Sequence, residues 1–155
     1  MKLRIVALGQ RMPAWVVAGF DDYARRLPRE FALELIELKP GPRGAGKSLT
    51  QILAAEAERI AQATRGWMVV ALDERGEPWS TAQLAARLRG WSNSGRSVAF
   101  VLGSADGLAA AIKRDADVTM TLSALTLPHG LARVVLVEQI YRAASLLRGH
   151  PYHRA

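Results

Sequence analysis

The sequence contains no cysteine and few aromatic residues. None of its 155 residues is Cys, and 6% are Phe, Trp or Tyr. The absence of Cys excludes a disulfide scaffold, thiolate metal sites and cysteine nucleophiles. A reducing compartment is the natural environment for such a chain, so we expect a cytoplasmic protein.

Long apolar runs are missing as well. The apolar run near the N-terminus ends at Gln10 and Arg11 after about five apolar positions, whereas a signal peptide needs roughly 7–15. No stretch approaches the ~18 consecutive apolar residues of a membrane-spanning helix. We therefore expect a soluble protein that has no membrane partner.

Hydrophobic residues are nevertheless abundant enough to build a core. They make up 50% of the chain and charged residues 23%, a balance that excludes an intrinsically disordered protein. A length of 155 residues fits one compact domain and leaves little room for two. We expect a single domain over residues 1–155.

Acidic residues are too few to balance the basic ones. Lys and Arg total 21 against 14 Asp and Glu, which gives a net charge of +7, and 17 of the 21 cations are Arg. Arg suits bidentate phosphate contacts better than Lys does. No acidic residue follows Glu138, so Arg142, Arg148 and His150 are candidate RNA contacts. A solvated, Arg-rich surface encoded by a GC-rich genome would have the same composition.

Strand-like and helix-like segments alternate along the chain. Hydrophobic patterning predicts strands over residues 2–8, 31–38, 67–72, 98–102 and 118–122, and helices over 13–27, 48–64, 80–91, a short segment ending near 114, and 131–147. Ser48 with Gln51 and Ser80 with Gln83 form capping boxes that mark two helix starts. Such alternation predicts an α/β fold with a mostly parallel sheet and helices on both faces.

The last predicted helix has an unusual composition. Between Leu131 and Ile140, apolar residues occur on every side, whereas a surface helix keeps one side polar. We expect this helix to be enclosed by the fold or to lie in a subunit interface.

Residues Gly41–Ser48 match the phosphate-binding P-loop pattern, between a predicted strand and a predicted helix. Asp73 and Glu74 follow a buried strand, as a magnesium-binding residue would in a nucleotide-hydrolysing protein. Against this, Glu34 and Glu37 make the preceding strand half-exposed rather than central. A P-loop nucleotide-binding protein is therefore an alternative that the pattern alone leaves open.

The C-terminal third carries more specific motifs. They are Leu122-Ser-Ala-Leu-Thr-Leu-Pro-His129, Arg133, Val137-Glu-Gln-Ile-Tyr-Arg-Ala143 and His150-Pro-Tyr-His-Arg154, together with Leu72-Asp73 and Gly103…Asp106-Gly107. With these motifs in order, the chain resembles the RlmH family from residue 1 to residue 155. The members of that family are SPOUT-class methyltransferases that methylate N3 of a pseudouridine in large-subunit (23S) ribosomal RNA.

The resemblance implies a fold, a cofactor and a partner. It implies a C-terminal trefoil knot, which sequence rules alone would have excluded, and a homodimer that binds 23S rRNA, as part of the assembled ribosome. The cofactor would be S-adenosylmethionine, and no metal would be needed because a sulfonium methyl is already electrophilic. By matching motifs, the cofactor pocket takes Leu72, Gly103, Leu122, Ser123, Ala124, Leu125, Thr126 and Leu127. A glycine at position 103 would let the backbone approach the ligand closely.

The resemblance also assigns the chemistry to the C-terminal tail. N3 of a pseudouridine carries a proton at neutral pH, so that proton must leave and the developing anion must be held. Candidates are His153 as proton acceptor, Arg154 as charge stabiliser and Tyr152 as a stacking or hydrogen-bonding platform.

The chain departs from the family pattern at two positions. The family usually has glycine where Ser104 stands and proline where Gly130 stands, and neither change removes a reacting side chain. The resemblance makes the P-loop interpretation the weaker one. A ribosome-binding protein without catalytic activity is the other alternative, and it would need no cofactor pocket.

Overall fold

A computed structural model describes residues 1–44 and 46–154, with the side chain of His153 outside the described part. In chain order the elements are β1 (Lys2–Leu8), α1 (Ala14–Arg26), β2 (Ala32–Leu38), α2 (Leu49–Ala63), β3 (Met68–Pro78), α3 (Thr81–Asn93), β4 (Val98–Leu102), α4 (Ala110–Asp115), β5 (Val118–Thr121), α5 (His129–Leu147) and a 3-10 turn over Pro151–Arg154. The expected alternation of strands and helices is confirmed.

The strands form one sheet. Within the described residues it has five strands in the order β2-β1-β4-β3-β5, and each neighbouring pair runs parallel. The central strand β4, Val98–Leu102, is buried at every position, as a strand covered on both faces should be. The predicted α/β class with a parallel sheet is confirmed.

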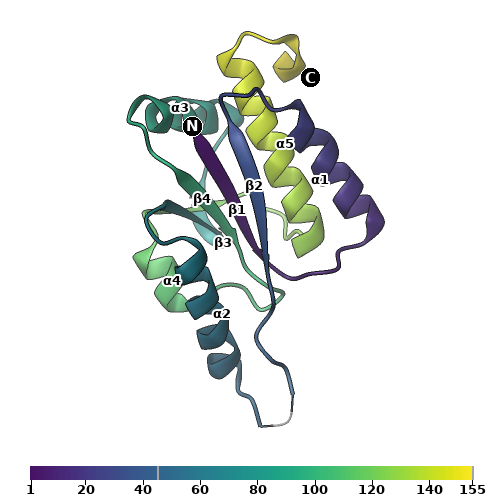
Figure 1. Cartoon of the computed structure of the whole chain (residues 1–155), viewed down its shortest axis with the longest axis vertical. Coiled ribbons are helices and arrows are strands. Elements are labelled where there is room, and N and C mark those ends of the chain that lie inside the picture. The colour runs from purple at the N-terminus through teal and green to yellow at the C-terminus, as the bar shows by residue number, and fades with distance from the viewer. Residues whose placement is uncertain (45, 155) are drawn as a thin grey trace.

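Helices cover both faces of the sheet (Figure 1). On one face, α1, α3 and α5 contribute Phe20, Leu88 and Ile140 to the larger hydrophobic core. On the other face, α2 and α4 cover a smaller core that contains Ile60 and Val101. Because the strands are parallel, the carboxyl ends of β3, β4 and β5 lie at the same end of the sheet, where the chain continues into loops.

Strand β2 is the outermost strand beside β1. It is an edge strand, and its alternating pattern leaves Glu34 and Glu37 exposed. Glu34 accepts a hydrogen bond from Arg4 Nε at 2.6 Å, which ties the edge strand to β1. The half-exposed character expected for this segment is confirmed.

Strand β3 is longer than the sequence predicts. It was expected to end at Leu72, but it continues to Pro78, and its pairing with β5 shifts register between Leu72 and Glu77. At Gly76 a Cβ atom would lie only 2.4 Å from the carbonyl carbon of Met120, so a side chain there would collide with β5. The strand leaves the buried part of the sheet at the register shift, so residues 73–77 are polar. Hydrophobic patterning therefore does not predict the extension.

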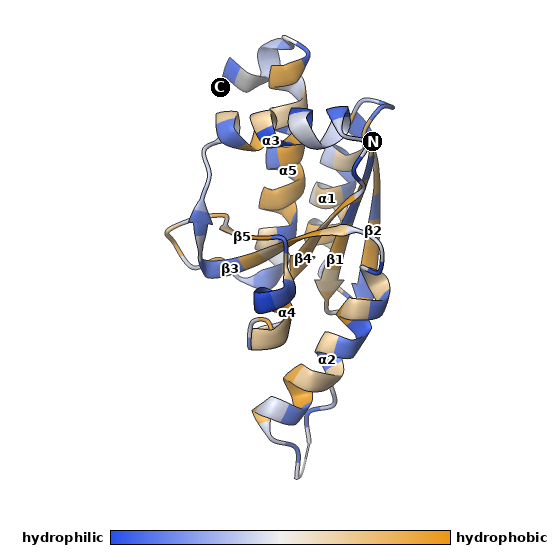
Figure 2. Cartoon of the chain, turned by 90° about the vertical axis from the view of Figure 1, so that its left-hand side faces the viewer, coloured by the Kyte–Doolittle hydropathy of each residue, from blue (hydrophilic) through white to orange (hydrophobic). Residues whose placement is uncertain are grey.

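Helix α5 packs against both α1 and α3. Every residue from Leu131 to Leu147 is buried or half-buried, and Leu136 and Ile140 are fully buried. Figure 2 shows that much of α5 is hydrophobic. The chain itself therefore encloses much of this helix, which confirms one of the two expectations for it. Val134, Val135 and Tyr141 are half-buried, and their burial by a second subunit stays a prediction.

Candidate functional site

A cavity among the described residues lies at the carboxyl ends of β3, β4 and β5. Its volume is about 740 Å³. Three segments form its walls: residues 72–75 of β3, the loop 102–108 after β4, and the loop 121–129 that leads from β5 into α5. Ligands of open parallel sheets bind in crevices of this kind, beyond the carboxyl ends of the strands.

The pocket gathers most of the residues expected to bind a cofactor. Its lining includes Leu72, Gly103, Leu122, Ser123, Leu125, Thr126 and Leu127. Ala124 lies in the same loop but is absent from the lining. Residues from three separate strands thus meet around one cavity.

Ser123 organises the loop after β5. Its hydroxyl accepts a hydrogen bond from the Leu125 backbone N–H at 2.9 Å, and its carbonyl accepts one from the Thr121 hydroxyl at 3.0 Å. Leu125 is 77% exposed although it is aliphatic and lines the pocket. The loop is held by its own polar groups and presents an uncovered apolar side chain at the rim of the pocket.

Gly103 has a structural role within the loop, and its expected close approach to a ligand stays a prediction. A Cβ atom there would lie 2.6 Å from the carbonyl carbon and oxygen of Gly107, because the loop 103–107 folds tightly onto itself. Ser104 and Gly107 form an antiparallel bridge, with the Gly107 N–H donating to the Ser104 carbonyl at 2.9 Å. Gly103 therefore permits the loop that forms the pocket wall to close, and this observation does not depend on a ligand.

Charged side chains surround the apolar part of the pocket. Asp73, Glu74 and Asp106 contribute three carboxylates against the two cations Arg75 and Lys113. Lys113 Nζ lies 3.7 Å from Asp73 Oδ1. Lys113 and Arg75 were not expected at this site, because their proximity depends on how α4 and the end of β3 pack, and no local motif indicates it.

Asp106 is held by a residue distant in sequence. Its carboxylate pairs with the guanidinium of Arg43, and the hydrogen bond raises the pKa of Arg43, with burial acting in the opposite direction. Asp106 does not cap the following helix, whose N-cap is Ala109.

The C-terminal tail lies at the opposite end of α5 from the pocket. His129 at the start of α5 lines the pocket, and the 19 residues of the helix span about 28 Å before the tail begins (Figure 1). Tyr152 and Arg154 therefore do not meet the pocket of their own chain. The side chain of His153, the expected proton acceptor, lies outside the described residues.

Tyr152 is anchored to the end of α5. Its hydroxyl donates to Glu138 Oε1 at 3.0 Å, and its ring packs edge-on against Tyr141 at 4.6 Å between centroids. Burial raises its pKa, and hydrogen bonds with Tyr23 and Glu138 raise it further. The tail is thus docked on its own helix through a neutral phenol.

The expected RNA contacts lie at this same end of α5. Arg142 pairs with Glu138 at 2.7 Å and stacks over the Tyr152 ring at 4.8 Å, and its hydrogen bond with Glu138 raises its pKa. Arg148 and His150 are both exposed, and Arg148 Nε lies 3.9 Å from Glu30 Oε1. Arg148 and His150 are available to a partner, and Arg142 is engaged within the chain.

The structure does not support a P-loop at residues 41–48. The Gly41 N–H donates to Glu56 Oε2 at 2.8 Å, and a Cβ at Gly41 would lie 2.5 Å from the Ile52 carbonyl oxygen. An amide that a P-loop would turn toward phosphate is thus bound to a carboxylate. Strand β2 before the loop is an edge strand, and Ala45 lies outside the described residues.

Among the described side chains, which leave out Ala45, His153 and Ala155, no group of three or more His, Asp or Glu is positioned to hold a metal ion. In the same part of the chain, no helix is long and apolar enough to span a bilayer.

Sequence comparison identifies close relatives of the whole chain. Two proteins named ribosomal RNA large subunit methyltransferase H, from Burkholderia multivorans and Burkholderia mallei, are 52% and 53% identical over 156 aligned positions. Each alignment covers 100% of both chains. The family described as "Predicted SPOUT methyltransferase" matches residues 1–153.

Solved structures share the fold at low sequence identity. A probable methyltransferase from Bordetella pertussis Tohama I superposes with a TM-score of 0.58 at 19% identity, covering 92% of this chain and 95% of that one. A probable methylase family protein from Haemophilus influenzae Rd KW20 gives 0.58 at 15% identity, covering 97% and 69%. With full-length relatives above 50% identity, this chain belongs to the SPOUT methyltransferases and, within them, to the family of ribosomal RNA large subunit methyltransferase H.

Proposed function

We propose that the protein is an S-adenosylmethionine-dependent methyltransferase that modifies N3 of a pseudouridine in large-subunit (23S) ribosomal RNA. The observation that carries the proposal is the pocket at the carboxyl ends of β3, β4 and β5. It unites seven residues that match the cofactor motif of the family, in a chain whose full-length relatives are named for rRNA methylation.

The residues of the pocket suit this cofactor. Leu72, Leu102, Leu108, Leu122 and Leu127 supply an aliphatic slot of the kind an adenine ring requires. The loops 103–107 and 121–127 bring backbone amides to the same cavity.

Bound in this slot, the cofactor supplies an electrophilic sulfonium methyl group. The residues of the chain must then orient the acceptor base, remove the N3 proton and hold the negative charge that develops. We assign the proton to His153, the charge to Arg154 and the orientation of the base to Tyr152. These roles rest on the family motif.

The site becomes complete only in a dimer. The tail lies about 28 Å along α5 from the pocket of its own chain, so a catalytic tail must reach the pocket of a second copy. A homodimer is also favoured by the apolar residues that α1 leaves uncovered, since Trp15 is 59% and Val17 48% exposed. To reach the pocket of the second copy, Tyr152 would have to break its hydrogen bond with Glu138.

Methyl transfer to ribosomal particles tests the proposal. Purified protein is incubated with S-adenosylmethionine labelled in its methyl group and with ribosomes or 23S rRNA from a strain that lacks the gene. We expect label in one pseudouridine of 23S rRNA. Binding to ribosomes without any transfer would favour the non-catalytic alternative and would overturn the proposal.

A further inference from the structure

A buried carboxylate lies just outside the pocket, on helix α2. Glu56 is only 2% exposed and occupies the apolar face of the helix, between Ile52 and Ile60. Burying a carboxylate is costly unless hydrogen-bond donors surround it. Its partners therefore reveal what the carboxylate holds in place.

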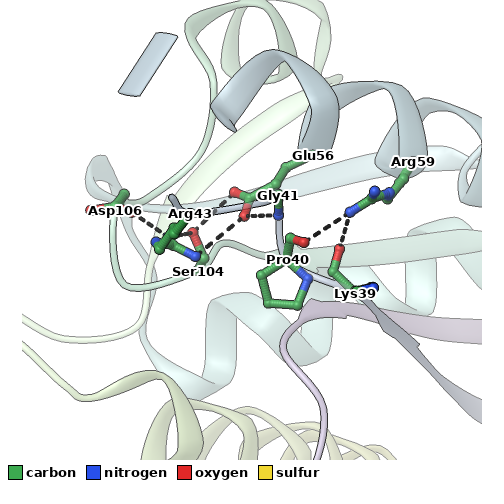
Figure 3. Close-up of polar contacts among 8 residues, drawn as sticks. All are labelled: Lys39, Pro40, Gly41, Arg43, Glu56, Arg59, Ser104 and Asp106. Atoms are coloured by element: carbon green, nitrogen blue, oxygen red, sulfur yellow. Dashed lines mark hydrogen bonds and ion pairs between the residues drawn. The ribbon is translucent and has the colours of Figure 1, made fainter. Parts of the chain in front are cut away.

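Both oxygens of Glu56 accept hydrogen bonds from segments far away in the sequence (Figure 3). Oε1 accepts from the Ser104 hydroxyl at 3.0 Å, and Oε2 accepts from the Gly41 N–H at 2.8 Å. Arg43 Nη1 lies 4.0 Å from Oε2. One side chain of α2 thus joins the loop after β2 to the loop after β4.

These contacts end on the wall of the pocket. Ser104 and Asp106 both line the cavity, and Arg43 donates to the Ser104 hydroxyl at 3.4 Å and pairs with Asp106. Helix α2 fixes the same loop from a second residue, because Arg59 Nη1 donates to the carbonyls of Lys39 at 2.6 Å and Pro40 at 3.0 Å (Figure 3). Residues 39–43 are therefore clamped between α2 and the pocket wall.

We infer that Glu56 is a positioning residue for the cofactor pocket: through Ser104, and with Gly41 and Arg43, it fixes the wall formed by residues 103–107. Glu56 does not line the cavity, so it acts only through the residues that it holds. The identity of the ligand rests on the function proposed above, whereas the clamp itself is a property of the chain without ligand.

Three variants separate positioning from general stability. Ser104→Ala removes the hydroxyl that links Glu56 to the wall, and Glu56→Gln keeps the shape but removes the charge that faces Arg43. Ser94→Ala is the matched control, because its hydroxyl donates to the Trp91 carbonyl at 3.1 Å at the end of α3, away from the cavity lining. All are made in the full-length protein.

Amide hydrogen exchange without ligand is the first measurement. We expect Ser104→Ala and Glu56→Gln to accelerate exchange in residues 103–108 by about tenfold, the effect of one lost buried hydrogen bond. Ser94→Ala should leave exchange there unchanged. Equal exchange in residues 103–108 of the wild type and both clamp variants would overturn the inference, whatever the ligand is.

Calorimetry and steady-state kinetics with S-adenosylmethionine are the second measurement. Each clamp variant should raise the Kd and the KM for the cofactor about tenfold and leave kcat at saturation unchanged. The double variant should lose less than the sum of the two single losses, because Glu56, Ser104 and Arg43 belong to one contact network. Wild-type affinity in both variants would refute the inference. Absence of binding to the wild type would instead refute the proposed function, and the exchange experiment would still decide on the clamp.

Discussion

Replacing Gly103 by Ala tests the pocket wall directly. The new Cβ would lie 2.6 Å from the carbonyl carbon and oxygen of Gly107, whereas ordinary contacts begin at 3.4 Å. The wall must therefore move by about 0.8 Å, and overpacking of this kind costs about 1–3 kcal/mol of folding free energy. The displaced wall should weaken S-adenosylmethionine binding by about 10- to 100-fold, which corresponds to about 1.4–2.8 kcal/mol.

The matched control is Gly90→Ala in helix α3. Gly90 is exposed, and a Cβ there meets nothing within 4 Å. This variant should gain about 0.5–1 kcal/mol of stability, because alanine is the better helix former, and should bind the cofactor as the wild type does. Calorimetry measures the Kd, and thermal unfolding measures the stability. Wild-type affinity in Gly103→Ala would refute our account of this wall.

Four further predictions concern the dimer and the tail. Val135→Glu, on the half-buried side of α5, should shift the protein from dimer to monomer in light scattering; a wild-type monomer at micromolar concentration would contradict this. Truncation after Gly149 should leave cofactor affinity nearly unchanged and lower single-turnover methyl transfer by at least about 100-fold; an unchanged rate would exclude the tail from the chemistry. Because the pKa of Tyr152 is raised, its phenol should stay neutral when free tyrosine ionises, and its contribution to stability should be lost only as pH rises above 10, the unperturbed value. The absorbance titration of the Tyr152→Phe variant, subtracted from that of the wild type, should therefore show one tyrosine that ionises above pH 10. Ionisation of that tyrosine at pH 10 would contradict the docked tail. Arg148→Gln should reduce the slope of log affinity for ribosomes against log salt by about one unit, and an unchanged slope would remove Arg148 from the interface.

The strands and helices could be predicted because their signals are local. Ser48 and Ser80 each form a capping box with the glutamine three residues later, as the sequence indicates. The fully apolar run Val98–Leu102 predicts a strand covered on both faces, which is where β4 lies. The continuation of β3 past Leu72 could not be predicted, since it depends on the close approach of Gly76 to β5.

The pocket could be predicted only through the family motif. The resemblance brings together Leu72, Gly103 and residues 122–127, and seven of those eight positions line one cavity. The sequence gives no indication that Lys113 and Arg75 join them. A signal for Glu56 was present, because an acidic residue on the apolar stripe of α2 needs partners, but only the folded chain reveals Ser104 and Gly41.

The tail shows where local reasoning fails. The resemblance makes the tail a catalytic arm, which stays a prediction, but it gives no indication that Tyr152 packs against Tyr141 and Glu138 of its own α5. These contacts depend on α5 ending next to the tail. The direction of the helix then places the docked tail far from the pocket of the same chain.

Mass mapping of 23S rRNA tests the central claim most directly. Ribosomal RNA from a strain that lacks this gene is compared with RNA from the parent and from a strain that carries the gene again. We predict the loss of one methyl group from a single pseudouridine and its return with the wild-type gene. An unchanged set of methylated nucleotides in the strain without the gene would contradict the account.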